Sequence, residues 1–318
     1  MSINQPVNIL SSRALMGMFW ERISQLRADQ ASLLNRLALN TVSDQASEDY
    51  GWLGAVPKMS EWIGKRQAHK LRAAKYTITN IHYEATIEIL LKDLRRDKTP
   101  QTRARINELA DTTELHKYEL LLSLMNGGAA TLCYDGQFFY DTDHVEGDSG
   151  AQSNDLALTA VAGATPTQVE MASIIQSLLQ AIYGFKDDRG RAMNRTARQF
   201  TLVVPNGYWG TALAAVNNNI LGGASNQATS NPLQNLPVTI DVVSEPDLTA
   251  QTLQLFRTDG VMKPFITQEE EGSLQISAKA EGSEFEFDNA AHQYGTEVWR
   301  NAGYGLWQYA VLGTVTDA

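Results

Sequence analysis

Apolar residues recur at helical spacing in two long stretches of the first half of the chain. Between residues 11 and 39 they predict an amphipathic N-terminal helix or helix pair (Leu15, Phe19, Ile23, Leu26, Leu33 and Leu37). A second helix is predicted to begin at Thr99-Pro100, with threonine as N-cap, and to end at Asn126-Gly127-Gly128. At about 1.5 Å per residue, its roughly 26 residues predict a rod of about 39 Å, which is long for a globular domain and suits a spine.

The segment between these helices, residues 50–90, has a β pattern but too few apolar residues for a core of its own. Two β-rich runs, Lys75–Thr79 and His82–Ile89, are joined around Asn80. We expect them to form the arms of a long hairpin or extended loop. Because such a hairpin cannot bury its own faces, we expect it to lie against another part of the molecule or against another chain.

A mixed pattern follows the predicted spine helix. Thr131–Tyr140 is rich in β-forming residues and leads into an acidic loop at 135–155. The capping-box pattern at Thr165-Pro166-Thr167-Gln168 predicts a helix that ends at Gly184. A small α/β subdomain is predicted next, with a strand at Phe200–Val204, a helix at Tyr208–Val216, a Gly/Asn/Ser-rich loop at Leu221–Pro237 and a strand at Val238–Val243.

The C-terminal part of the chain, from Gln251 onward, has the alternating pattern of half-buried strands. Trp299–Val315 is rich in aromatic residues and predicts a buried strand pair that returns to the core. The alternation is seen at Leu253/Leu255, Leu274/Ile276/Ala278 and Phe285/Phe287.

The composition is that of an ordinary globular protein. The chain has 318 residues, 43% of them hydrophobic and 19% charged, enough for two or three subdomains. Its one cysteine, Cys133, excludes an internal disulfide framework, and we expect it to be a small buried apolar residue. No apolar run reaches the roughly 18 residues of a transmembrane helix, and no secretory signal opens the chain. We therefore expect folding in a reducing cytoplasm and no membrane contact.

Charge is distributed unevenly along the chain. The net charge of −10 argues against a dedicated nucleic-acid binder. Residues 58–105 nevertheless carry twelve Lys/Arg against five Asp/Glu, whereas residues 269–297 carry eight acids and only Lys279. Such asymmetry is typical of complementary surfaces within a subunit or between neighbours. Two solvated faces that never meet are the alternative.

Candidate metal sites are weak in this sequence. Asp141-Thr142-Asp143-His144 places two carboxylates and an imidazole together, but short acidic clusters are common in turns and a transition metal needs three or four convergent ligands. Glu114, His116 and Glu119 lie on the predicted spine without the His-Glu-x-x-His arrangement. We expect neither a metal nor another cofactor.

Candidate catalytic and nucleotide sites are weaker still. The strand-turn-helix at 204–210 contains two glycines, but it is neither Gly-x-Gly-x-x-Gly nor a P-loop, and Asn206 as a helix cap explains it. The chain has no Gly-x-Ser-x-Gly elbow, and its five histidines are scattered. A hydrolase built on the α/β region 155–250 therefore lacks a nucleophile–base pair, and we expect no enzyme.

Several stretches, which follow one another over nearly the whole chain, together resemble the Mu-like phage major head subunit family. Residues 150–250 match the family less clearly. The matching stretches are Ser12–Trp20, Tyr50-Gly51-Trp52-Leu53-Gly54, Glu61-Trp62-Ile63-Gly64-Lys65-Arg66, Cys133-Tyr134-Asp135-Gly136-Gln137-Phe138-Phe139, Asp143-His144, Lys263-Pro264-Phe265-Ile266 and Ala302-Gly303-Tyr304-Gly305-Leu306-Trp307-Gln308.

This resemblance implies an α+β fold of the Hong Kong 97 type of phage capsid protein. The expected parts are an N-terminal arm (1–49), an extended E-loop hairpin (50–90), a peripheral P-domain (91–154) with a spine helix at 100–125, an axial A-domain (155–250) and C-terminal strands that complete both domains (251–318).

The same resemblance implies a major capsid protein that assembles as hexamers and pentamers into an icosahedral head around phage DNA. Its expected partners are further copies of itself, scaffolding protein, portal, maturation protease, packaged double-stranded DNA without sequence-specific binding, and a decoration protein. Its expected location is the virion, and the host cytoplasm during assembly. An encapsulin-like nanocompartment remains the alternative within shell proteins, and it differs in enclosing protein cargo.

The charge asymmetry then predicts a contact between subunits. In the resembled fold the E-loop lies over the P-domain of the adjacent subunit, so basic residues in the loop would face acidic strands there. The expected contact joins Lys58, Lys65, Arg66, Lys70, Arg72 and Lys75 to Glu269, Glu270, Glu271, Glu281, Glu284 and Glu286.

Overall fold

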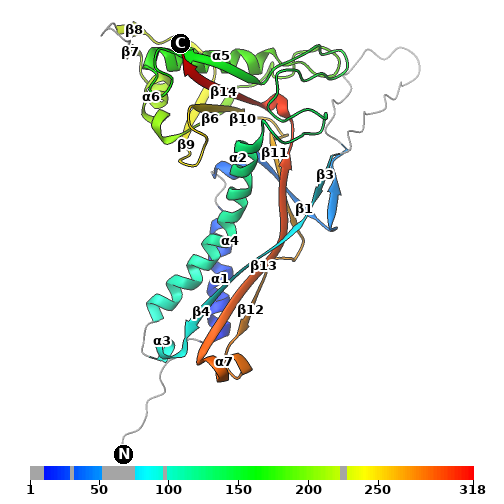
Figure 1. Ribbon diagram of the computed structural model, residues 1–318, viewed down its shortest axis with the longest axis vertical. Helices are drawn as coiled ribbons and strands as arrows, with labels where there is room; N and C mark the ends of the chain where they lie inside the picture. Colours follow the sequence, from blue (N-terminus) through cyan, green and yellow to red (C-terminus); the bar gives the residue numbers. More distant parts are fainter. Residues whose placement is uncertain (1–10, 29–31, 52–75, 96–98, 223–227) are drawn as a thin grey trace, which may run out of the picture.

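The computed structural model describes residues 11–28, 32–51, 76–95, 99–222 and 228–318. The protein is built on two five-stranded sheets. One sheet runs along an elongated arm, and the other lies in a broader lobe at the end of that arm (Figure 1). We call the part built on the first sheet the arm, and the part built on the second sheet the upper lobe.

The arm sheet is centred on one long strand, β13 (Ala291–Tyr304). It pairs antiparallel with β4 (Ile81–Leu90) and, in successive stretches, with β12 (Gln275–Lys279) and β11 (Phe265–Glu270). Strand β1 (Ala38–Ser43) adds parallel to β11. Residues of this one sheet are therefore far apart in the sequence.

Helix α4 (Thr99–Gly127) is the spine of the arm. Its 29 residues extend over about 44 Å at 1.5 Å each. Helix α1 (Ser12–Arg27) packs along it and begins at Ser11, whose hydroxyl caps the Ala14 amide. Apolar residues of the two helices pack in one core with Tyr294 and Val298 of β13 and with β4. The helix residues are Leu15, Phe19, Ile23, Ile106 and Leu109.

The upper-lobe sheet has the strand order β5-β14-β10-β6-β9. These strands are β5 (Asp155–Ala160), β14 (Ala310–Asp317), β10 (Thr252–Arg257), β6 (Gln199–Val204) and β9 (Thr239–Ser244). Helices α5 (Gln168–Gly184) and α6 (Asn206–Asn217) pack against it. All six residues of β10 are buried, as is typical of a strand covered on both faces.

Shorter elements complete the chain. They are α2 (Leu33–Leu37), β2 (Ser47–Asp49), β3 (Thr77–Thr79), α3 (Leu91–Arg95), β7 (Ile220–Gly222), β8 (Ala228–Ser230), η1 (Pro232–Asn235), α7 (Glu284–Asn289) and η2 (Trp307–Tyr309). Among the described residues, none of the helices combines the length and the apolar character that crossing a bilayer requires.

The hairpin predicted between Lys75–Thr79 and His82–Ile89 is wrong in its pairing. Strand β3 pairs with β2, and β4 pairs over its whole length with β13. The reason is the alternation in β4, which directs Tyr83, Ala85 and Ile87 toward the arm core. Burial of that row of side chains stabilises β4 in the large sheet more than pairing with a three-residue strand would.

Four other local predictions also differ from the structure. Thr131–Tyr140 forms turns with one isolated bridge, Leu132–Phe138, instead of a strand. Phe285 and Phe287 lie on helix α7, which begins after the cap Ser283. The predicted loop at 221–237 contains β7, β8 and η1, and the two strands predicted within 299–315 belong to different sheets.

Two helix starts are shifted by one or two residues. The capping box of α5 is formed by Thr167 and Glu170 instead of Thr165 and Gln168. Helix α6 has Pro205 at its N-cap, without a side-chain cap, and Asn206 is its first helical residue. In α5 the acidic Glu170 also favours the helix N-terminus, so the later box is the stronger one.

Candidate functional site

A buried polar cluster lies in the turns that follow the spine helix. Gly128 lies against Tyr140, and a Cβ at this glycine would come within 2.5 Å of the ring, so the chain can turn here only without a side chain. Gly136 adopts a positive φ of 89°, which favours glycine and closes the turn that carries Cys133 and Asp135. His144 is brought to this turn by its pairing with Gln152.

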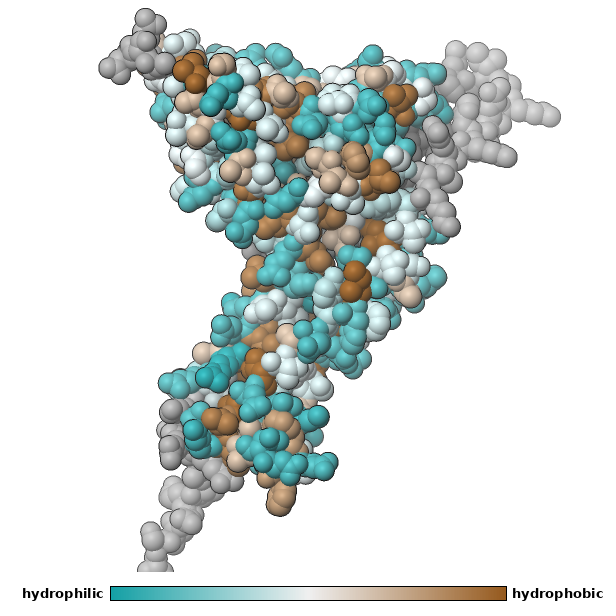
Figure 2. All heavy atoms as spheres, in the orientation of Figure 1, coloured by the Kyte–Doolittle hydropathy of each residue, from teal (hydrophilic) through white to brown (hydrophobic). Residues whose placement is uncertain are grey.

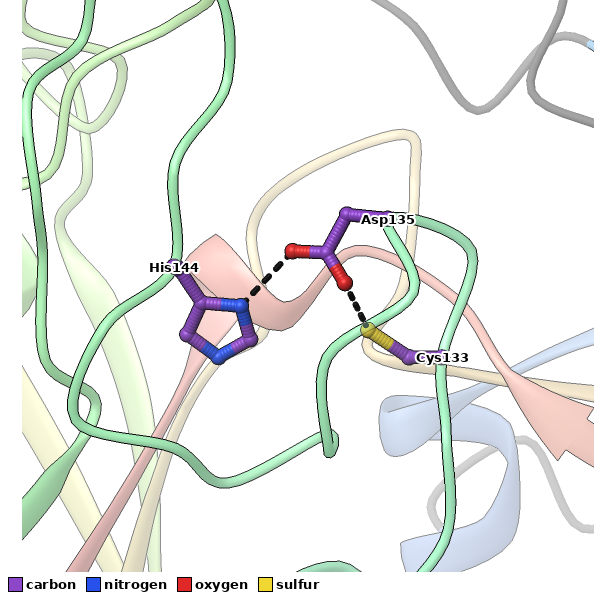
Figure 3. A group of neighbouring side chains, drawn as sticks. All are labelled: Cys133, Asp135 and His144. Atoms are coloured by element: carbon purple, nitrogen blue, oxygen red, sulfur yellow. Dashed lines mark hydrogen bonds and ion pairs between the residues drawn. The ribbon is translucent and has the colours of Figure 1, made fainter.

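Asp135 is the centre of this cluster (Figure 3). Its two carboxylate oxygens bind different partners, His144 Nδ1 at 2.7 Å and the Cys133 thiol at 2.9 Å. The Gln137 amide also donates to it, at 3.1 Å. Cys133 is 5% exposed and His144 is fully buried, so these contacts are shielded from water.

The His144 ring is fixed on all sides. It stacks on Trp307 with 4.0 Å between ring centroids and an interplanar angle of 7°. Its Nε2 lies 3.2 Å from Asn154 Oδ1, an oxygen that also accepts from the Asp141 amide, while Asn154 Nδ2 donates to the Phe139 carbonyl. Each ring nitrogen thus lies within hydrogen-bond distance of a side-chain oxygen, which holds the ring in one orientation.

Burial and hydrogen bonding set the pKa values in the cluster. Burial raises the pKa of the Cys133 thiol far above its ordinary value, and the adjacent Asp135 raises it further. Burial also disfavours the Asp135 carboxylate, but hydrogen bonds from His144 and Cys133 outweigh it and lower the pKa of Asp135. The result is a neutral thiol beside an ionised carboxylate.

This arrangement does not match a cysteine–histidine catalytic triad. In such a triad the base contacts the nucleophile, whereas here Asp135 lies between Cys133 and His144. The thiol pKa is raised, which is opposite to the shift that activates a nucleophile. The cluster therefore offers ligand atoms and hydrogen bonds instead of nucleophilic chemistry.

In the sequence His144 lies beside Asp141 and Asp143, but in the structure the carboxylate that binds its ring is that of Asp135. Asp143 accepts from the Gln137 side chain at 3.1 Å, and Asp141 accepts from the Phe138 amide at 3.2 Å. His144 turns away from both into the core, toward Asp135. The Cys-x-Asp spacing in a glycine turn was the available signal, whereas Asn154 and Trp307 come from positions that the sequence does not connect to it.

Glu114, His116 and Glu119, the candidate set on the spine that the sequence disfavoured, have separate partners in the structure. Glu114 binds Arg27 at 3.1 Å and Lys117 at 3.0 Å, whereas Glu119 is exposed. His116 packs against the Tyr83 ring, and burial and Arg300 lower its pKa. These three side chains therefore form no common ligand set.

The structure describes only the acidic residues of the predicted contact between subunits. Lys58, Lys65, Arg66, Lys70, Arg72 and Lys75 lie outside the described residues. Glu269 is engaged within its own chain, by Arg27 at 2.8 Å and Lys117 at 3.0 Å. Burial disfavours the Glu269 carboxylate, but these two cations outweigh it and lower its pKa.

The other five acids lie along the arm. Glu271, Glu281 and Glu284 are exposed, and Glu270 is partly buried at the end of β11. Glu281 accepts from the Ser12 amide at 3.0 Å, and Glu286 accepts from the Gly282 amide at 2.7 Å. Figure 2 shows hydrophilic residues over much of the lower end of the arm, interrupted by single apolar ones.

Two characterised relatives match part of the chain. The major capsid protein of Escherichia phage Mu is 32% identical over 134 residues, which is 42% of this chain and 44% of that protein. The Mu-like prophage FluMu major head subunit of Haemophilus influenzae is 30% identical over 149 residues, 47% of this chain and 48% of that protein. The matched part thus spans about half the length of these relatives.

A solved structure matches more of the chain. The procapsid of bacteriophage JBD30 has a TM-score of 0.54 at 24% sequence identity, and the match covers 95% of this chain and 74% of that one. This likeness establishes the fold, which is the α+β fold of tailed-phage capsid proteins, as the sequence predicted.

The family model of the Mu-like prophage major head subunit gpT matches residues 13–166 and 234–316. The unmatched stretch includes α5, β6, α6, β7 and β8, within the region where the sequence resembled the family least. The two matched parts cover most of the arm and four strands of the upper-lobe sheet, β5, β9, β10 and β14. The chain therefore belongs to the family of Mu-like prophage major head subunits.

Proposed function

We propose that this chain is a major capsid protein whose copies assemble as hexamers and pentamers into an icosahedral head that encloses phage DNA. The observation that carries the proposal is the family match over residues 13–166 and 234–316. The likeness to a procapsid subunit over 95% of the chain supports it through the fold. The family is that of a structural subunit, and we infer that the chain catalyses no reaction.

Exposed apolar side chains support association between copies. Val42, Val161, Val261 and Phe287 are 70%, 76%, 88% and 91% exposed, and they lie on both the arm and the upper lobe. Scattered apolar residues are ordinary on a monomer, and in a capsid subunit these four are candidates for contacts between copies. Contacts on several sides of a subunit are what a closed shell needs.

We assign the arm to the P-domain and the upper lobe to the A-domain of the capsid fold. Because β4 belongs to the arm sheet, we now propose a shorter E-loop than 50–90, with its base at β2 and β3. The N-terminal arm of the capsid fold, a different part from the arm built on the first sheet, is proposed to lie within 1–49. In the structure its helix α1 packs on the spine of the same subunit.

We further propose that the basic E-loop residues bind the acidic side of a neighbouring arm. Glu270, Glu271, Glu281, Glu284 and Glu286 are the proposed partners, whereas Glu269 already has two cations in its own chain. Exposed pairs contribute little individually, so the contact would set the register and rate of assembly more than its affinity.

Other partners follow from the proposed role. Scaffolding protein, portal and maturation protease would act during assembly in the host cytoplasm, and a decoration protein would bind the finished virion. A net charge of −10 suits a wall that encloses DNA without binding it tightly.

Assembly of the purified chain tests the proposal. We expect closed shells, or free hexamers and pentamers, in negative-stain micrographs of the chain expressed with and without a scaffolding protein. Analytical ultracentrifugation that shows only a 35.1 kDa monomer under every assembly condition would contradict it. The contents of purified particles, nucleic acid or a protein cargo, distinguish a phage head from a nanocompartment.

A further inference from the structure

We propose that Cys133, Asp135 and His144 form a binding site for a divalent metal ion of the Zn²⁺ type. Their ligand atoms, a thiol sulfur, a carboxylate oxygen and an imidazole nitrogen, all lie within 4.8 Å of one another. Sulfur, nitrogen and carboxylate oxygen are the donors that Zn²⁺ accepts, at about 2.0 to 2.3 Å. Three protein ligands leave the fourth tetrahedral position for a water molecule.

Only small shifts are needed for the three donors to share one ion. Ligand atoms of a tetrahedral Zn²⁺ site lie about 3 to 4 Å apart, which follows from the usual bond lengths. The two oxygens of Asp135 lie 2.7 Å from the His144 nitrogen and 2.9 Å from the Cys133 sulfur, so these pairs would move slightly apart, and all three ligand atoms already lie within 4.8 Å of one another. A small rotation of the carboxylate would let one of its oxygens share the ion with both neighbours (Figure 3).

The charges of the three ligands balance that of the ion. A Zn²⁺ ion held by a thiolate, a carboxylate and a neutral imidazole sums to zero, so no net charge has to be buried. Metal binding displaces the thiol proton and any proton on the imidazole nitrogen that becomes a ligand, and these protons go to the solvent.

The surroundings hold the histidine as a ligand requires. Histidines that bind metals commonly donate their second ring N–H to an oxygen, which fixes the ring and directs the other nitrogen at the ion. Asn154 Oδ1 accepts from His144 Nε2 at 3.2 Å, and Trp307 stacks on the ring face. Asn154 is itself fixed by the Phe139 carbonyl and the Asp141 amide.

The ion would join the two sides of the loop after the spine helix. Cys133 and Asp135 lie on the first turn, and His144 lies where the chain pairs with Gln152 before β5. Leu132, Phe138 and Val145 on the same turns are 56%, 41% and 57% exposed, so the cluster lies directly beneath the surface. A metal there would hold the two sides of this loop together in both the free subunit and an assembled shell.

Metal analysis of the untagged full-length chain tests the proposal. We expect one Zn²⁺ per chain to remain after incubation with the metal and gel filtration, and none in Cys133→Ala or His144→Gln. His82→Gln is the matched control, because His82 also pairs with a carboxylate, Glu297 at 3.1 Å, but is exposed. That variant should keep its Zn²⁺. Asn154→Ala, which removes an outer partner, should weaken binding about 10- to 100-fold.

A spectroscopic measurement on the unaltered chain guards against variants that fail to fold. Co²⁺ bound by Cys133 should give a thiolate-to-cobalt charge-transfer absorption in the near ultraviolet, and excess Zn²⁺ should remove it. The proposal is overturned if Co²⁺ gives no such band, or if the unaltered chain retains no Zn²⁺ above background. Equal retention by the His144→Gln and Cys133→Ala variants would overturn it as well, since the ion would then be bound elsewhere.

Discussion

The arm and the upper lobe bury their sheets in different ways. In the upper lobe, β10 is buried along its whole length and helices α5 and α6 pack on the sheet. In the arm, β4 alternates between partly buried and exposed residues, and only one face lies under α1 and α4. The open face carries the stacked pair His82 and Trp299, the latter 41% exposed. The upper lobe can thus stabilise itself, whereas the arm leaves a face available to another chain.

The arm contains a network of linked charges, whereas the buried Arg257 of the upper lobe pairs with Asp259. In the arm, Arg27 and Lys117 share Glu114 and Glu269, between α1, the spine helix and β11. Beside them Arg300 is 1% exposed, and its Nε and Nη1 have no hydrogen-bond partner in the part of the chain that the structure describes. Burial lowers the pKa of Arg300, and Glu269 opposes that shift. Stability of the arm should therefore depend on pH and salt more than that of the upper lobe.

The largest expected effect is the loss of a core side chain in the upper lobe. Phe256→Ala empties a fully buried position on β10, beside Phe265, and should destabilise the fold by about 3–5 kcal/mol. Ile87→Ala, on the half-buried face of β4, should cost about half as much, because part of its surface already meets water. Urea unfolding of both variants measures this difference, and equal costs would contradict the comparison.

The second-largest loss of stability is expected from removing one carboxylate of the partly buried charge cluster in the arm. Glu269→Gln leaves Arg27, Lys117 and Arg300 facing Glu114 alone, and should destabilise the fold by about 2–3 kcal/mol. Asp111→Asn is the control, because the Arg22–Asp111 pair is exposed and should be worth less than about 1 kcal/mol. Denaturant unfolding at low ionic strength compares them. A larger loss from Asp111→Asn would show that burial is not the cause.

The same carboxylate should make the arm sensitive to acid. The pKa of Glu269 is lowered in the fold, so its contribution is complete above the unfolded value of about 4.3 and is lost as pH falls through the lower folded value. Unfolding followed from pH 6 to pH 3 should show this loss below about pH 4, and Glu269→Gln should remove part of the slope. An unchanged slope in that variant would assign the acid sensitivity to other groups.

How far the sequence predicted these structures depended on the length and regularity of each pattern. Helices α4 and α5 repeat their apolar residues over several turns, so their positions were predicted to within a few residues. The pattern over 11–39 predicted a helix or helix pair, and the structure has a pair, α1 and α2. The alternation at Phe285/Phe287 covers too few residues to distinguish a strand from a helix. The segment forms a helix because Ser283 caps it and Glu286 accepts a hydrogen bond from the Gly282 amide. The strand partner of β4 could not be predicted, because β13 lies about 200 residues away.

The polar cluster shows the same limit at the level of single residues. The sequence placed Cys133 in a buried run and His144 in an acidic turn, and both positions are buried in the structure. The Cys-x-Asp spacing was the one local signal for Asp135, but nothing local indicated that His144 would bind Asp135 or that Trp307 would stack on the histidine, because tertiary packing decides these contacts. Expectations about which residue types are buried were therefore more accurate than expectations about which side chains meet.

Helix caps allow a smaller, matched test in the two regions. Thr167→Ala removes a reciprocal capping box from α5 in the upper lobe, whereas Ser11→Ala removes a single bond from α1 in the arm. We expect a loss of about 1–2 kcal/mol for Thr167→Ala and about 0.5–1 kcal/mol for Ser11→Ala. Thermal unfolding of the two variants ranks them, and the reverse order would mean that the box adds nothing.

The smallest effect per contact is expected where the open arm would meet a neighbouring E-loop. Lys65→Glu with Arg66→Glu should slow or prevent shell formation, and Glu271→Lys in the same chain should partly restore it if the two surfaces meet. Each exposed pair is worth less than about 1 kcal/mol. However, many copies of the contact add up, and they are screened over a Debye length of about 8 Å at physiological ionic strength. Light scattering during assembly at rising salt measures the rate.

Lys92→Glu with Arg103→Glu, an equal charge change outside the loop, is the control. Equal slowing by the control pair would attribute the effect to net charge, and assembly unaffected by the loop variant would exclude the contact.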